Sequence, residues 1–120
     1  MENSDIYLRA MMSLLARSAF PPDKLADIVS PVANAKTYEI YNLFDGTRSQ
    51  SDVTKTSATD HGLLSRTVKR WIDDGVMIKI SDAGTIRPVH IYPVPDRYIE
   101  AAKKKIKGKP NGRRTDSPEA

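Results

Sequence analysis

The chain has 120 residues, 39% of them apolar, which is the size and composition of one folded domain rather than of a disordered chain. It contains no cysteine, which excludes disulfides, thiolate metal sites and cysteine nucleophiles. The net charge of +4 arises in residues 101–120, which hold seven Lys/Arg and two Asp/Glu, because residues 1–100 hold twelve Lys/Arg and thirteen Asp/Glu.

The first predicted element is a helix from about residue 4 to residue 20. Arg9, Ser13 and Arg17 recur at every fourth position and form one narrow polar stripe, while nearly every other residue is apolar. A small domain offers too little core to cover a helix that is apolar around most of its circumference. We therefore expect a second copy of the chain to cover it in a homodimer. The predicted dimer interface consists of Ile6, Leu8, Met11, Met12 and Leu15.

Three short helices are expected next, at residues 23–29, 34–44 and 47–57. Pro22 suits the first position of the first of them, and Asn34 is a capping residue for the second. Ser49 and Asp52 have the spacing of a capping box for the third. The inward face of the middle helix is expected to consist of Ile40, Leu43 and Phe44, with Tyr38 or Tyr41 joining it.

A helix with a clear amphipathic period is predicted from residue 61 to residue 74. Asp60 precedes it as a capping residue, and Gly75 ends it. Its apolar side, which we expect to face the core, consists of Leu64, Val68, Trp71 and Ile72. The opposite side of this helix is therefore free to meet solvent or a ligand.

The hydrophobic period then changes from about 3.6 to about 2, which predicts strands at residues 76–80 and 86–92 joined by a turn at residues 81–85. Pro88 cannot donate a hydrogen bond to a neighbouring strand, so it indicates an edge strand or a local irregularity. Together the two strands predict a β-hairpin.

A last helix is predicted at residues 97–105, with Asp96 as its cap. Residues 106–120 have no period and little that can be buried, so they are expected to form a disordered basic tail. The expected fold is mainly α with a small β-hairpin, an α+β domain over residues 1–105.

The order helix, helix, tight turn, helix and hairpin indicates a winged helix-turn-helix. In that plan the second helix of the pair, here about residues 60–74, enters the major groove of DNA, and the wing at residues 76–92 lies on the flank. Residues 46–72 hold five Lys/Arg and two Asp, a local positive excess in a domain that is otherwise net negative. We therefore expect this region to bind double-stranded DNA.

Most of the candidate DNA-binding residues lie on the exposed side of the predicted 61–74 helix. Ser65 and Arg66 can donate to base edges, while Lys69 and Arg70 lie further along the helix and suit phosphates. The full predicted set is His61, Ser65, Arg66, Lys69 and Arg70, with Arg48 before the helix pair and Lys79 and Arg87 in the hairpin.

Residues 65–77 read Ser-Arg-Thr-Val-Lys-Arg-Trp-Ile-Asp-Asp-Gly-Val-Met. This run resembles the recognition helix and first wing strand of multiple-antibiotic-resistance (MarR) type regulators, and the likeness extends over about residues 34–92. The resemblance implies a winged helix-turn-helix fold and a transcriptional regulator in which Ser65, Arg66 and Lys69 face bases or phosphates. The hairpin departs from the family pattern because it is short and lacks the usual Asp-x-Arg at its tip.

A second interpretation is a winged-helix protein-interaction module within a transcription or nucleic-acid-processing complex. The near-neutral charge of residues 1–100 and the short hairpin favour this interpretation, and a fold by itself does not fix function. Sequence-specific binding that persists without the basic tail would distinguish the regulator from the interaction module.

An enzyme, a metal site and a cofactor are not expected. His61 and His90 are far apart and lack zinc-ligand spacing, and the sequence has no glycine-rich phosphate loop or nucleophile elbow. The first residues are polar and acidic, unlike a signal peptide, and no apolar run is long enough to span a bilayer. We therefore expect a cytoplasmic protein.

Overall fold

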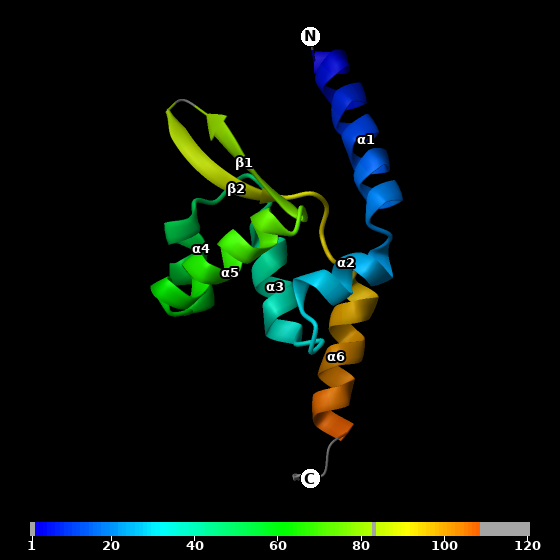
Figure 1. Cartoon of the computed structure of the whole chain (residues 1–120), viewed down its shortest axis with the longest axis vertical. Helices are drawn as coiled ribbons and strands as arrows, with labels where there is room; N and C mark the ends of the chain where they lie inside the picture. Colours follow the sequence, from blue (N-terminus) through cyan, green and yellow to red (C-terminus); the bar gives the residue numbers. More distant parts are fainter. Residues whose placement is uncertain (1, 83, 109–120) are drawn as a thin grey trace.

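The computed structural model describes residues 2–82 and 84–108 (Figure 1). The elements in this part of the chain are α1 (Glu2–Ala19), α2 (Pro22–Val29), α3 (Ala35–Leu43), α4 (Gln50–Ser57), α5 (His61–Asp73), β1 (Met77–Asp82), β2 (Thr85–His90) and α6 (Asp96–Gly108). The protein is thus mainly helical with a small two-stranded antiparallel sheet, which confirms the expected α+β class.

The core is built around the indole ring of Trp71, on α5. The ring of Tyr41 meets this indole edge-on with the centroids 5.1 Å apart, and the ring of Phe44 does so at 6.3 Å. All three side chains are fully buried, so the predicted core position of Trp71 is confirmed. Edge-to-face contacts of this kind add about 0.5–1.5 kcal/mol per pair to the stabilisation from burial alone.

The predicted caps are present at the starts of three helices. Asn34 and Asp60 each accept a hydrogen bond from the backbone N–H three residues ahead, at 3.1 and 2.9 Å. Ser49 and Asp52 form the complete capping box, in which each side chain accepts a hydrogen bond from the other residue's backbone N–H. These bonds satisfy N–H groups that have no partner within a helix, and so define where α3, α4 and α5 begin.

The inward face of α3 differs from the predicted one. Tyr38 and Tyr41 are both buried, whereas Ile40 and Leu43 are only half-buried. The reason is that α6 packs along α3, so a second side of the helix is covered in addition to the side that faces α5. The Tyr41 hydroxyl is satisfied inside the core because it donates to the carbonyl oxygen of Val76.

The hairpin has the predicted antiparallel pairing but a shorter turn. Asp82 pairs with Thr85, so both strands extend into the segment that the sequence assigns to the turn. Gly84 has φ +81°, a left-handed backbone conformation that favours glycine at a hairpin turn. Pro88 pairs with Lys79 without breaking the register. A two-stranded sheet has only edge strands, which is why this proline is tolerated.

Helix α1 projects from the body of the protein, as Figure 1 shows. Its C-terminal end is anchored by two contacts: Tyr92 donates to the carbonyl oxygen of Phe20, and the guanidinium of Arg17 lies 4.3 Å from the centre of the Tyr92 ring. Further toward the N-terminus, seven large apolar side chains are 51–69% exposed; they are Ile6, Tyr7, Leu8, Met11, Met12, Leu14 and Leu15. The apolar surface that the sequence expects to be covered is therefore bare in the single chain.

Helix α6 lies at the opposite end of the long axis from α1 and extends to Gly108. The sequence predicted its end at Lys105, so residues 106–108, assigned to the tail, belong to the helix backbone. The rest of the predicted tail, residues 109–120, lies outside the described residues. Among the described helices, none combines the length and the apolar character needed to cross a membrane.

Candidate nucleic-acid interface

Helix α5 is fixed to the body of the protein along one side. Leu64, Val68 and Trp71 are buried, and the indole Nε1 of Trp71 donates to the carbonyl oxygen of Val29 at 3.1 Å. The turn before α5 is tight, with Ala58 in the left-handed conformation at φ +53°. The packed side and the turn together determine which side of α5 faces outward.

The outward side of α5 presents Arg66 and Lys69, and both side chains are exposed. Within residues 2–82 and 84–108, neither cation has a hydrogen bond or ion pair with another side chain. A Cβ atom built on Gly62 would lie 3.6 Å from an Nη atom of Arg66, so this guanidinium reaches back toward the first turn of α5. In the helix-turn-helix plan the first turn is the end of the helix that meets base edges.

Ser65 lies at the α4 edge of this outward side rather than in its centre. Its Oγ accepts a hydrogen bond from Nε2 of Gln50, the first residue of α4, at 2.8 Å. Both residues are half-buried. The sequence did not single out Gln50, because its neighbour is fifteen positions away and no period connects the two residues.

Arg70 is placed differently from the predicted phosphate-binding position. Its Nη1 and Nη2 donate to the carbonyl oxygens of Ile28 and Val29, at 2.9 and 3.1 Å, and its guanidinium is 3.6 Å from the carboxylate of Asp74. The two carbonyls belong to the last turn of α2, where backbone acceptors have no partner within the helix. Arg70 thus links α5 to α2, and the structure does not bring it together with Arg66 and Lys69.

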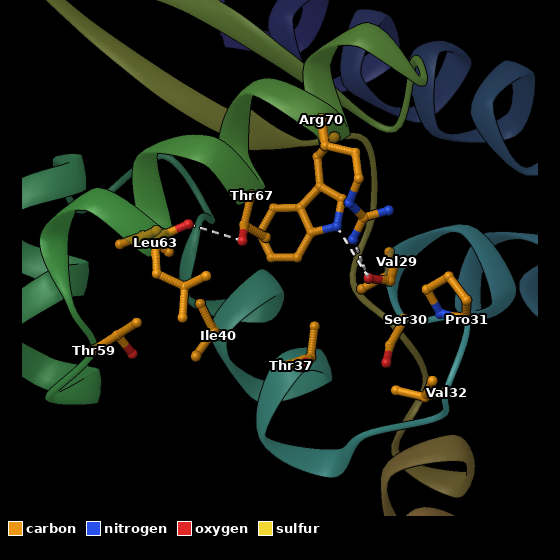
Figure 2. Close-up of a pocket in the computed structure, with 12 residues that line it drawn as sticks. Val29, Ser30, Pro31, Val32, Thr37, Ile40, Thr59, Leu63, Thr67 and Arg70 are labelled. Carbon is orange, nitrogen blue, oxygen red and sulfur yellow. Dashed lines mark hydrogen bonds between the residues drawn. The ribbon is translucent and has the colours of Figure 1, made fainter.

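A pocket of about 270 Å³ lies on the Arg70 side of α5 (Figure 2). Its walls come from α3, α5, the α2–α3 segment and the α4–α5 turn; the lining residues are Val29, Ser30, Pro31, Val32, Thr37, Ile40, Thr59, Leu63, Leu64, Thr67, Arg70 and Trp71. The Thr67 hydroxyl donates to the Leu63 carbonyl oxygen, and the Ser30 Oγ accepts from the backbone N–H of Asn34. The lining is mostly apolar, and these polar groups are satisfied within the protein, so the pocket has no marked chemistry of its own.

Of the other predicted cations, two have partners within the protein and one is exposed. Arg48 is 3.3 Å from the carboxylate of Asp45, and Arg87 donates to the carbonyl oxygen of Gly46 at 3.2 Å. Lys79 is exposed on the hairpin. With Arg48, Arg70 and Arg87 engaged inside the protein, fewer cations can meet phosphate than the composition of this region suggests.

The two histidines have different environments. His61 is exposed at the start of α5, next to the outward side. His90 is half-buried against the ring of Tyr41, with the ring centres 5.5 Å apart, and this burial lowers the pKa of its imidazole. Over the described residues, no group of three His, Cys, Asp or Glu side chains is arranged to hold a metal ion.

No protein-family model, curated protein or solved structure matches this chain. The assignment of a function therefore depends on the geometry of α4, α5 and the hairpin.

Proposed function

We propose that this protein is a cytoplasmic, homodimeric regulator of transcription that binds double-stranded DNA through a winged helix-turn-helix. The carrying observation is that Arg66 and Lys69 are exposed and unpaired, among the described residues, on the one side of α5 that the core leaves free. Cations on the free side of a helix can contact base edges, as Arg does with guanine, or phosphates.

The arrangement of elements supports α5 as the recognition helix. It follows α4 through a tight turn and is followed at once by the hairpin, which projects from the body beside it (Figure 1). Arg66 is the base-reading residue of this proposal because a guanidinium can donate two hydrogen bonds to guanine. Lys69 binds phosphate, and the exposed Lys79 on β1 contacts the flanking backbone.

The exposed face of α1 supports the homodimer. Soluble proteins seldom leave a continuous apolar patch of more than a few hundred Å² uncovered, and such patches mark interaction surfaces. The predicted interface residues Ile6, Leu8, Met11, Met12 and Leu15 are all more than half exposed in the single chain. A two-fold dimer would recognise a pseudo-palindromic site with half-sites about 34–36 Å apart.

The second candidate function is a protein-interaction module, and one observation favours it. Ile78, Ile80 and Ile86 are exposed on the hairpin, at 40, 38 and 65%. Exposed apolar side chains along a wing suit a protein surface better than a phosphate backbone. In this function, α1 or the hairpin would bind a partner, and Arg66 and Lys69 would be solvated.

A chain that ends at Gly108 separates the two functions, because it keeps α6 and removes the basic residues beyond it. The regulator should bind one selected duplex more tightly than random duplex, with a preference of about 10³-fold or more at moderate salt. The interaction module should show no such preference in either chain, because lysines that remain on α6 bind any duplex alike. The measurement is a competition titration of labelled selected duplex with unlabelled random duplex, at two salt concentrations for both chains.

A further inference from the structure

The contact between Gln50 and Ser65 joins the two helices that the proposed function places on DNA. Gln50 begins α4 directly after its cap, Ser49, and Ser65 lies one turn before Lys69 on α5. The Nε2–Oγ distance of 2.8 Å is that of a well-formed hydrogen bond. The carboxamide of Gln50 therefore sits at the edge of the surface that carries Lys69 and Arg66.

The hydrogen-bonding capacity of these two side chains is only partly used. A carboxamide has two N–H donors and one carbonyl acceptor, and the bond to Ser65 takes one donor. Over residues 2–82 and 84–108, the remaining N–H and the carbonyl oxygen of the Gln50 side chain have no partner within the protein. Because the Ser65 Oγ accepts this bond, its own proton is also left to donate.

One free donor beside one free acceptor matches a single base edge. In the major groove adenine presents N7 as an acceptor and the N6 amino group as a donor, whereas guanine presents two acceptors. A glutamine amide can donate to N7 of adenine and accept from its N6 amino group. Against guanine, the carbonyl oxygen of the amide would face a second acceptor. The hydrogen bond to Ser65 restricts the amide before DNA arrives, which reduces the entropy lost on binding.

We propose that Gln50 determines specificity by reading the adenine of one A·T pair in the major groove, and that Ser65 is its positioning residue. This inference rests on the proposed function. To the proposed function it adds the class of base pair that the site prefers. It also adds a base-reading residue that lies outside the recognition helix. Arg66, which suits guanine, then reads a different base pair of the same half-site.

The rival explanation is that the contact only holds α4 against α5. A purely mechanical contact predicts that its loss lowers thermal stability and weakens every duplex by the same factor. A reading contact predicts a loss confined to one base position. The pattern of base preference, and not the affinity alone, therefore distinguishes the two roles.

The experiment uses the full chain and a selection of bound duplexes from a random pool, followed by titration of the selected duplex and of versions changed at one base pair. The variants are Gln50→Met, which keeps the length of the side chain, and Gln50→Glu, which keeps its shape. Thr56→Ala, exposed on the same helix, is the matched control. Melting temperatures are measured on every variant.

At one A·T position, the wild-type chain should prefer A·T over G·C by roughly 5- to 150-fold. Gln50→Met should abolish that preference and leave the other positions unchanged. Gln50→Glu should shift it toward cytosine, whose N4 amino group is a donor. Thr56→Ala should select the wild-type sequence.

Ser65 is tested as a positioning residue by rescue. Ser65→Ala should weaken the same A·T preference without creating a new one, and Ser65→Thr, which keeps the hydroxyl, should restore it. An effect of Ser65→Ala at a different base position would show that the serine reads DNA itself and would overturn its positioning role.

The assignment is overturned if the wild-type chain selects a defined sequence and Gln50→Met selects the same sequence with every preference intact. It is also overturned if Gln50→Met weakens all duplexes equally. A wild-type chain that selects no sequence overturns the proposed function, and this assignment with it.

Discussion

At the level of single residues, the guanidinium of Arg70 holds two helices together. It caps the end of α2 by donating to two backbone carbonyls, while Trp71 donates to one of the same carbonyls. The indole bond is buried, whereas the Arg70 side chain is 42% exposed, so solvent weakens its ion pair with Asp74. The energetic weight of Arg70 therefore lies in its hydrogen bonds.

Arg70→Ala should destabilise the protein by about 1–2 kcal/mol, because it leaves carbonyl oxygens at the end of α2 without this donor. The free energy of unfolding is measured by urea denaturation. Lys69→Ala, at an exposed neighbouring position, is the matched control and should change stability by less than about 0.5 kcal/mol. Equal stability of the two variants would contradict the role assigned to Arg70.

His90 should make stability depend on pH. Burial against Tyr41 lowers the pKa of this imidazole below its ordinary 6.5, so the unfolded chain takes up the proton more readily than the folded chain. The stabilisation is present above pH 6.5 and is lost as the pH falls through the ordinary value toward the folded one. The lowered pKa values of Asp45 and Asp52 act in a more acidic range, below about 4.

The check is a series of denaturation curves between pH 5 and pH 8. We expect wild type to lose stability toward pH 5, and His90→Gln to show a flatter dependence over the same range. His61→Gln, at the exposed histidine, should follow wild type. A His90→Gln curve parallel to wild type would contradict the assignment.

Features of single residues are predictable from the sequence where the interacting residues are close together in the chain. The caps at Asn34, Ser49 and Asp60 depend on neighbours three residues away, and all three were predictable. Arg70 and Arg87 depend on carbonyls 41 or 42 positions away, which only the folded chain brings near. A basic residue on an exposed helix face therefore looks the same in the sequence whether it binds phosphate or a neighbouring helix.

At the level of elements, the length and register of the hairpin have a local origin, whereas its orientation depends on distant residues. Its length and register follow from alternation and a glycine turn, which the sequence contains. Its orientation depends on Arg87, which ties β2 to the Gly46 carbonyl, and on the contact of β1 with α5. The same long-range dependence explains why the second covered face of α3 was not predicted, because α6 follows it by more than fifty residues.

If the hairpin is a wing that touches DNA, Lys79→Ala should weaken binding nearly equally for all duplexes. The slope of log K against log salt should fall by about 1 for each lost phosphate contact. Lys36→Ala, exposed on α3, should leave the slope unchanged. A Lys79→Ala slope equal to wild type would contradict a phosphate contact by the hairpin at Lys79.

At the level of the whole molecule, the protein is elongated, 55 Å in its longest dimension, with α1 projecting at one end and α6 at the other. Within the described residues, the apolar face of α1 is a large surface that no other part of the single chain covers. The apolar composition of α1 can be seen in the sequence, and the expectation of a second copy of the chain comes from the same residues.

Leu15→Glu should convert a dimer to a monomer, because it places an unpaired charge within the apolar face of α1. Val32→Glu, at a side chain that is 78% exposed outside α1, is the matched control and should stay dimeric. Sedimentation equilibrium gives the mass directly. A wild-type chain that is monomeric at high concentration would contradict the dimer.

The proposed function depends on the outward side of α5, and a titration of three variants of the chain probes that side. Wild type, Arg66→Ala and Arg97→Ala are each titrated with the duplex that wild type selects and with random duplex; Arg97 is an exposed arginine on α6. Arg66→Ala should cost about 1–3 kcal/mol on the selected duplex and relax the preference at one base position, while Arg97→Ala should match wild type. Unchanged affinity and preference in Arg66→Ala would show that Arg66 does not read DNA and would contradict the proposed function.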